Sequence, residues 1–186
     1  MTVYEADWIC PASGPPIREG RIAVENGRIV ETPGHRDNVV RFSGCAIIPG
    51  FVNAHSHIEL TILRGYLDHL PFIDWIPRLT HAKYNVLSRD EMLASARLGA
   101  IEMLQAGMTC LGEVMDLGAA WDAMREFGLQ GVAYQEVFGP AEAQADEAMS
   151  GLKRKIEDYS QQVSDTLRVG VSPHAPFTVC SAVQYQ

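Results

Sequence analysis

From residue 46 onward, strand-like and helix-like segments alternate, and this alternation constrains the fold more than any other feature of the sequence. Each strand-like segment is short and rich in apolar residues, and each helix-like segment follows a helical spacing. Such an order predicts a parallel sheet with right-handed crossovers, either open or closed into a barrel. We expect strands at 46–55, 109–114, 131–137 and 167–172, and helices at 71–84, 88–107, 119–127 and 140–163.

The first 48 residues have a different character, with short alternating segments separated by turns. Residues 11–16 (PASGPP) break the chain, and Asn26 and Gly27 predict a tight hairpin between two strands. We therefore expect two parts, a small β unit at 1–48 and an α/β unit at 49–186. The apolar run at 46–55 predicts a strand buried on both faces.

Composition excludes several classes of function. The chain of 186 residues has a formal net charge of −8, which argues against a nucleic-acid partner. An acidic amino terminus and the lack of a long apolar stretch predict neither a signal peptide nor a membrane span. The cysteines form no CxxC pair, so we expect reduced, buried thiols in a cytoplasmic protein; they are Cys10, Cys45, Cys110 and Cys180.

Two histidines at the end of the first α/β strand give the sharpest chemical signal. His55 and His57 are two residues apart, so on a strand both project from the same face. The carboxyl ends of parallel strands are where such folds place their ligands, and paired imidazoles form half of a metal site. We predict one divalent metal, with zinc as the default and iron as the alternative. The competing interpretation is a pair of ordinary loop histidines.

Other polar residues also follow predicted strands. His174 lies between two prolines after the last strand and is interpreted as a substrate contact, a metal ligand or a plain loop histidine. Glu59 could contact a substrate amine or orient an imidazole, or it could be a solvated loop acid. Glu113 and Glu136 lie near the ends of the second and third strands, where carboxylates contact substrate or form structural pairs.

Residues 48–57 (IPGFVNAHSH) resemble the first barrel strand of the amidohydrolase superfamily, in the branch that holds cytosine, guanine and adenosine-type deaminases and the triazine chlorohydrolases. Residues 55–60 and 134–139 resemble deaminases that act on aminodeoxyfutalosine. The resemblance implies the N-terminal half of a (β/α)8 barrel preceded by a β-sandwich segment. It also implies deamination of a purine-like or other heterocyclic amine by metal-activated water, with His174 on the substrate, in a homo-oligomer. Dehalogenating and amide-cleaving relatives remain alternatives.

The same resemblance places further ligands and the proton-transferring acid on later strands. These are a third histidine, a glutamate, another histidine and an aspartate, all expected downstream of Gln186. A full barrel takes about 250 residues, and we expect four of its eight strands here. We therefore predict no catalytic residue within this chain, a truncated enzyme and no activity from these 186 residues alone. The alternative is a catalytically inactive half-barrel that acts as a binding or assembly module.

Overall fold

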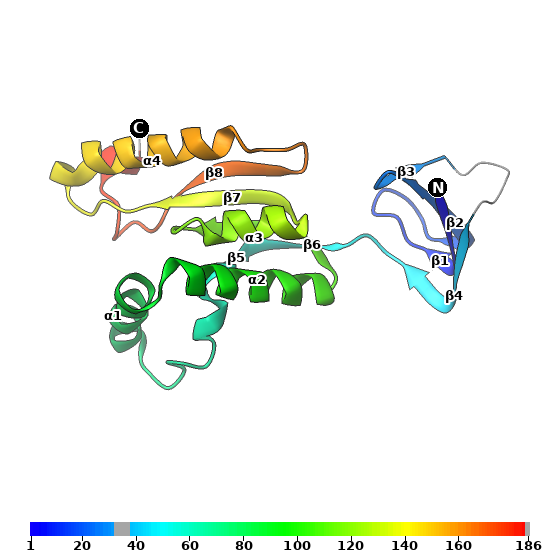
Figure 1. The fold of residues 1–186 in the computed structure, drawn as a ribbon, viewed down its shortest axis with the longest axis horizontal. Helices are drawn as coiled ribbons and strands as arrows, with labels where there is room; N and C mark the ends of the chain where they lie inside the picture. Colours follow the sequence, from blue (N-terminus) through cyan, green and yellow to red (C-terminus); the bar gives the residue numbers. More distant parts are fainter. Residues whose placement is uncertain (32–37, 185–186) are drawn as a thin grey trace. The chain divides into compact units, whose positions relative to one another are not determined.

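The computed structural model describes residues 1–31 and 38–184, which form two compact units (Figure 1). The N-terminal unit comprises Met1–Gly50 and the C-terminal unit comprises Phe51–Gln186. The division falls two residues after the boundary expected from the sequence.

The N-terminal unit is a four-stranded sheet in the order β3-β2-β1-β4. Strands β2 and β3 form the expected hairpin, because Asn26 and Gly27 both have positive φ, as its tight turn requires. Strand β1 pairs antiparallel with β2 and parallel with β4. The strands are β1 (Thr2–Ile9), β2 (Ile17–Glu25), β3 (Arg28–Val30) and β4 (Val39–Ile47).

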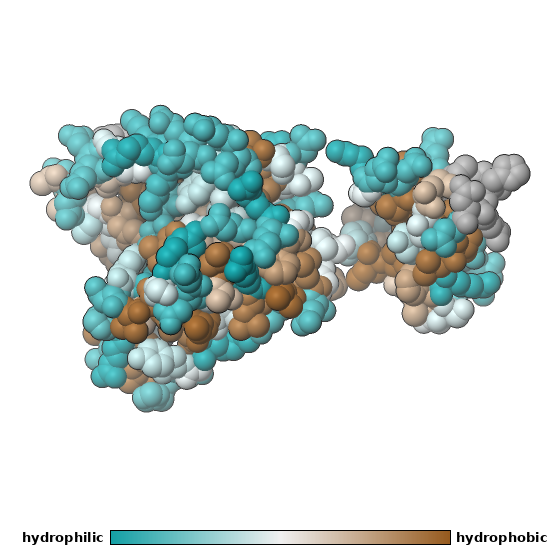
Figure 2. Space-filling model, viewed as in Figure 1, coloured by the Kyte–Doolittle hydropathy of each residue, from teal (hydrophilic) through white to brown (hydrophobic). Residues whose placement is uncertain are grey.

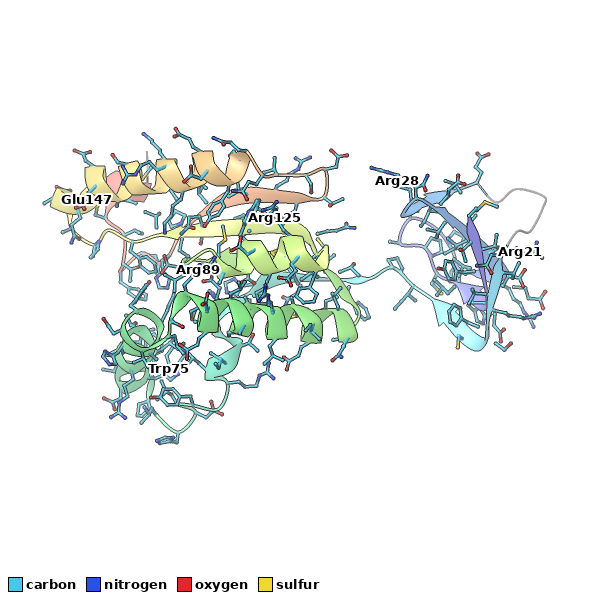
Figure 3. All side chains as sticks on the ribbon, viewed as in Figure 1. Arg21, Arg28, Trp75, Arg89, Arg125 and Glu147 are labelled. Carbon is cyan, nitrogen blue, oxygen red and sulfur yellow. The ribbon has the colours of Figure 1, made fainter. Side chains whose placement is uncertain are left out.

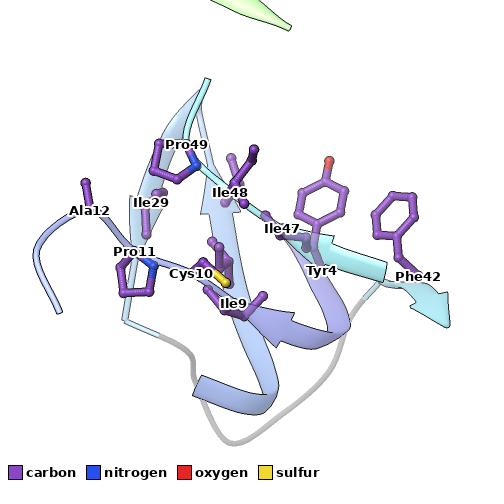
Figure 4. A pocket seen from close by; sticks show the side chains of 12 residues that line it. Tyr4, Ile9, Cys10, Pro11, Ala12, Ile29, Phe42, Ile47, Ile48 and Pro49 are labelled. Carbon is purple, nitrogen blue, oxygen red and sulfur yellow. The ribbon is translucent and has the colours of Figure 1, made fainter. Parts of the chain in front are cut away.

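One face of this small sheet carries an apolar groove of about 510 Å³ (Figure 4). Side chains from all four strands line it, including Tyr4, Ile29 and Phe42. In the space-filling view, hydrophobic residues reach the surface of this unit (Figure 2). Several of these apolar side chains are exposed, such as Ile29 and Phe42.

The C-terminal unit contains a parallel sheet in the order β5-β6-β7-β8, with helices between successive strands (Figure 1). This arrangement confirms the predicted alternation and the parallel pairing. The strands are β5 (Phe51–Ser56), β6 (Met108–Met115), β7 (Gln130–Val137) and β8 (Leu167–Pro173). The main connecting helices are α2 (Arg89–Gln105), α3 (Ala119–Phe127) and α4 (Ala145–Ser160).

The core of this unit lies between the sheet and helices α2 and α3. Its largest members, Trp121, Met92 and Met115, are almost completely buried. Helix α2 begins with a capping box in which the Ser88 hydroxyl accepts from the Glu91 backbone and the Glu91 carboxylate accepts from the Ser88 backbone. The predicted start of this helix is therefore confirmed, and the core fixes the strand ends that carry the polar residues.

The loop between β5 and α2 holds several shorter helical segments. Helix α1 (Phe72–His81), which carries Trp75, continues into η2 (Ala82–Val86), so the helix predicted at 71–84 changes its winding at residue 82 (Figure 3). A short helix η1 (Ile58–Leu63) follows the histidine pair directly. Near the other end of the chain, η3 (Glu142–Gln144) precedes α4, and α5 (Ser181–Gln184) follows β8.

Two expectations were wrong. The apolar run at 46–55 is not one buried strand, because β4 ends at Ile47, Pro49 and Gly50 interrupt the ladder, and Val52 in the edge strand β5 is 68% exposed. The thiols are free but not buried: Cys45 is exposed on β4, and the other three are partly exposed. Among the described residues, no helix is long and apolar enough to cross a membrane.

Candidate metal and substrate site

The carboxyl ends of the four parallel strands meet at one edge of the C-terminal sheet. They bring together polar residues that are far apart in sequence: His55 near the end of β5 and His57 directly after it, Asp116 after β6, Glu136 near the end of β7 and His174 after β8. This is the edge at which parallel α/β folds bind their ligands.

The two histidines of the first strand face each other. Their Nε2 atoms are 3.1 Å apart, and the Nδ1 of His57 lies 3.0 Å from the backbone oxygen of Val114. Because a carbonyl oxygen can only accept, Nδ1 of His57 must donate, and its Nε2 therefore carries a lone pair. The Asn53 side-chain oxygen accepts a hydrogen bond from the His55 backbone amide at 3.2 Å and so stabilises the backbone at His55.

This arrangement fits a metal ligand pair. Two nitrogens bound to one zinc at about 2.0–2.1 Å in tetrahedral geometry are about 3.3 Å apart, close to the 3.1 Å observed. A backbone oxygen on the distal ring nitrogen is the usual partner of a zinc-bound imidazole. Within residues 1–31 and 38–184, no third histidine, cysteine or acid completes a metal-binding group with them. The chain therefore presents two convergent ligands.

The protonation of His57 favours the same role. Desolvation by the surrounding protein and the neighbouring His55 ring lower the pKa of His57, so its imidazole is neutral near pH 7. A neutral imidazole is the form that binds metals. An open pocket of about 280 Å³, lined by both histidines, lies beside the pair.

Glu59, two residues after His57, turns its carboxylate away from water. It is 2% exposed and accepts from the backbone amides of Asp116, Leu117 and Ala120 at 3.1–3.3 Å. These amides belong to the β6–α3 loop and the first turn of α3, where helices leave donors unpaired. The structure thus excludes the solvated loop acid that the sequence left open and gives Glu59 three backbone partners.

Glycine at position 99 allows helix α2 to approach the segment behind the histidine pair. A Cβ built on Gly99 would lie 2.5 Å from the Thr61 hydroxyl oxygen and 2.8 Å from Cβ of Ile58. Any larger residue would push η1 away from α2. The close packing therefore fixes the position of η1, which carries Glu59.

Glu113 supports the same segment from inside the sheet. It is fully buried and accepts from the Ser56 hydroxyl at 2.5 Å and from the Ile58 backbone amide at 2.8 Å. Burial raises the pKa of Glu113 to about 8. Its two contacts flank His57 in sequence, so Glu113 holds the backbone on either side of that histidine.

His174 lies at the same end of the sheet but follows β8, the outer strand opposite β5, and it has local partners. The Thr178 hydroxyl donates to the Ala175 carbonyl oxygen, so it must accept from Nδ1 of His174 at 2.8 Å. The neutral ring then presents its Nε2 lone pair toward Glu136, whose Oε1 is 3.8 Å away. Phe138 stacks at a tilt on the ring with a centroid distance of 4.7 Å.

Three further residues here were missed by the sequence analysis. The Lys83 ammonium of η2 lies 3.1 Å from the Asp116 carboxylate, and the Tyr84 hydroxyl donates to the same carboxylate. Burial raises the pKa of Glu136 to about 7, and the nearby Lys83 charge opposes that rise. Burial and then the Lys83 charge lower the pKa of His174. Asp116 could have been noticed, since it lies two residues after a predicted strand, but Lys83 has the features of an ordinary lysine on a helix surface.

Comparison with known proteins agrees with this geometry. Residues 46–182, which include the whole parallel sheet and both histidines of the pair, match the profile of the amidohydrolase family. The chain belongs to the amidohydrolase family. The resemblance predicted from residues 48–57 is thereby confirmed.

Curated relatives of this amidohydrolase chain are deaminases. It is 33% identical over 175 residues to a 5′-deoxyadenosine deaminase of Methanothermobacter thermautotrophicus, covering 89% of this chain and 40% of the relative. It is 28% identical over 171 residues to a 5-methylthioadenosine/S-adenosylhomocysteine deaminase of Desulforamulus reducens, covering 87% and 39%. The chain thus spans about two fifths of the length of these relatives.

Solved structures show the same fold. The chain aligns with Helicobacter pylori aminofutalosine deaminase in complex with methylthio-coformycin at a TM-score of 0.78 and 17% identity, covering 99% of this chain and 46% of that one. It aligns with the zinc complex of atrazine chlorohydrolase from Arthrobacter aurescens at 0.82 and 13%, covering 98% and 49%. The predicted fold, part of an amidohydrolase barrel preceded by a small β unit, is confirmed.

Proposed function

We propose that this chain supplies the metal-binding strand and part of the substrate pocket of a metal-dependent deaminase. The observation that carries the proposal is the convergence of the His55 and His57 Nε2 atoms at 3.1 Å. The deaminase names of the relatives support a purine-like substrate, with other heterocyclic amines as the broader class.

A divalent metal at this pair, zinc by default and iron as the alternative, would supply an activated water near neutral pH. Val114 holds His57 in the tautomer that leaves Nε2 free. His174 offers its own Nε2 as an acceptor for a donor group of the substrate, because its Nδ1 keeps the proton and donates it in a hydrogen bond to Thr178. These residues bind and orient the reactants.

We assign Glu59 a positioning role in place of a direct substrate contact. Its two carboxylate oxygens already accept three backbone hydrogen bonds, and a ligand would have to break them in a buried site. Glu113 is equally enclosed between Ser56 and Ile58. We therefore propose that proton transfer to the leaving group depends on an acid outside these 186 residues, and that the chain alone does not deaminate.

A second candidate is an assembly module without catalysis. The observation that favours it is the open sheet: within the described part of the chain, β5 and β8 each have one strand neighbour, so both edges can pair with another polypeptide. Under this hypothesis a second copy completes the sheet as a homo-oligomer. A soluble dimer that retains no zinc would support the module, whereas a chain that binds zinc through His55 and His57 supports the deaminase.

The test of the proposed function is to determine the coding sequence beyond the codon for Gln186 and to express the complete reading frame. We expect zinc-dependent release of ammonia from 5′-deoxyadenosine or 5′-methylthioadenosine. Mutation of a residue that only hydrogen-bonds to a metal ligand typically costs about 10–100-fold. His55→Ala and His57→Ala should each lower kcat/KM by more than that. The exposed loop residue His69 provides the matched control, His69→Ala. Unchanged activity in both site variants would refute the proposal.

A further inference from the structure

Asp116, directly after β6, collects more polar contacts than its place in a loop would suggest. Its side chain is 10% exposed. One carboxylate oxygen lies 3.1 Å from Nζ of Lys83 and accepts from the Tyr84 hydroxyl, and the other lies 3.8 Å from Nζ of Lys155. A buried carboxylate with two cations and a phenol is fully compensated.

The backbone of Asp116 is equally engaged. Its amide donates to the Glu59 carboxylate at 3.3 Å, and its carbonyl oxygen accepts from Lys155 at 3.0 Å and from Gln135 at 3.1 Å. Contacts from η1, η2, β7 and α4 therefore meet at this one residue. Asp116 therefore has little freedom to move. Residues that contact its side chain are fixed at the carboxyl end of β6.

Its side chain holds the segment 72–86, which comprises α1 and η2. None of the ten residues of α1 is buried, and within η2 only Ala82 is. The apolar side chains of Phe72 and Ile73 remain mostly exposed. Trp75, Ile76 and Leu79 are only partly buried, so the polar contacts of Lys83 and Tyr84 with Asp116 add to a limited apolar attachment of this segment.

The same contact places a positive charge at the site. The Lys83 side chain is 12% exposed. Burial has the largest influence on the pKa values of Glu136 and His174, and the Lys83 charge lowers both. We propose that Asp116 is a positioning residue that anchors segment 72–86 to the carboxyl end of β6 and so fixes the position of the Lys83 ammonium at that strand end. This anchoring is independent of which reaction the protein catalyses.

Hydrogen exchange of the whole 186-residue chain, followed by mass spectrometry, tests the anchor. In Asp116→Asn we expect the amides of 72–86 to exchange at least about tenfold faster, because a charged hydrogen-bond partner is lost. The matched control is Asp122→Asn, which removes the same charge from an exposed ion pair with Arg89 and should leave 72–86 unchanged. Unchanged exchange in 72–86, or equal acceleration in β6, β7 and β8, would overturn the proposal.

A Lys83→Met variant keeps the aliphatic stem and covers the case in which Asp116→Asn fails to fold. Lys83→Met should accelerate hydrogen exchange in 72–86. The double variant, Lys83→Met with Asp116→Asn, should show a smaller acceleration than the product of the two single effects, because both changes remove the same contact. Multiplicative effects would show that Lys83 and Asp116 act separately, against the proposal.

The ionisation of Tyr84 gives a readout that depends on charge. Burial and the Asp116 carboxylate raise the pKa of Tyr84. Asp116→Asn should therefore lower that pKa, measured by the ultraviolet absorbance of tyrosinate and assigned with Tyr84→Phe. Asp122→Asn should not lower it. A Tyr84 pKa that is the same in Asp116→Asn and in the unmodified chain would contradict the assignment of Asp116 as the anchor.

Discussion

His57 and His174 lie at the carboxyl ends of two strands of the same sheet, yet the protein holds them in different ways. His57 is bonded to Val114, and the segment on either side of it is bonded to Glu113, both more than 50 residues away in sequence. His174 is bonded to Thr178, four residues away, and lies against the ring of Phe138.

The difference matches the demands of the two proposed tasks. A metal ligand must keep one tautomer and one direction, and long-range bonds into a buried sheet provide both. A substrate contact tolerates adjustment, and a short loop provides that. The comparison predicts that removing support near His57 affects the whole unit, whereas removing support near His174 remains local.

The largest effect should come from Glu59, which ties the segment after His57 to helix α3. Glu59→Ala leaves three backbone donors without their acceptor, so we expect it to lower the free energy of unfolding by about 3 kcal/mol in urea denaturation. Glu91→Ala, at the exposed capping box of α2, is the matched control and should lower the free energy of unfolding much less than Glu59→Ala. Equal losses in the two variants would contradict the special role of Glu59.

An intermediate effect should appear in the pH dependence of stability. Since burial raises the pKa of Glu113 from 4.5 to about 8, the folded protein holds a proton that the unfolded chain releases. This contribution to stability is complete below about pH 4.5 and is lost as the pH rises through about 8.

Between pH 5 and pH 8, the free energy of unfolding should therefore decrease less steeply with pH in Glu113→Gln than in the unmodified chain. The measurement uses metal-free protein at steps of about one pH unit. Glu126→Gln, in the exposed ion pair with Arg97, is the control and should keep the slope of the unmodified chain. A Glu113→Gln chain with the original slope would show that Glu113 is ionised in the folded state.

The smallest effect should come from Thr178, on the local side of the comparison. Thr178→Val removes the acceptor of His174 Nδ1, so the ring should populate both tautomers, with a loss of about 1 kcal/mol in stability. Nitrogen chemical shifts of the imidazoles report the tautomers, and those of His57 should not change. A change at His57 of the same size would break the distinction between the two histidines.

Much of this fold could be predicted from local sequence signals. The helix at 119–127 was predicted with both ends in place, because Gly128 adopts the left-handed conformation that ends a helix. The apolar run at 46–55 was misjudged, since apolar content does not reveal which strand forms the edge of a sheet.

The histidine pair could be predicted because spacing of two along a strand is itself geometric information. The partners of Glu59 could not, because Asp116, Leu117 and Ala120 lie 57–61 residues away and meet it only through the packing of η1, β6 and α3. The Lys83–Asp116 contact was missed for the same reason. Pairings across elements depend on tertiary structure, which one sequence without relatives does not specify.

The most direct test of the metal site is a zinc titration of the 186-residue chain, followed by the nitrogen chemical shifts of its imidazoles. The account predicts that one zinc shifts Nε2 of both His55 and His57 while Nδ1 of His57 keeps its proton and its bond to Val114. Zinc that binds at other histidines and leaves His55 and His57 unchanged would contradict it.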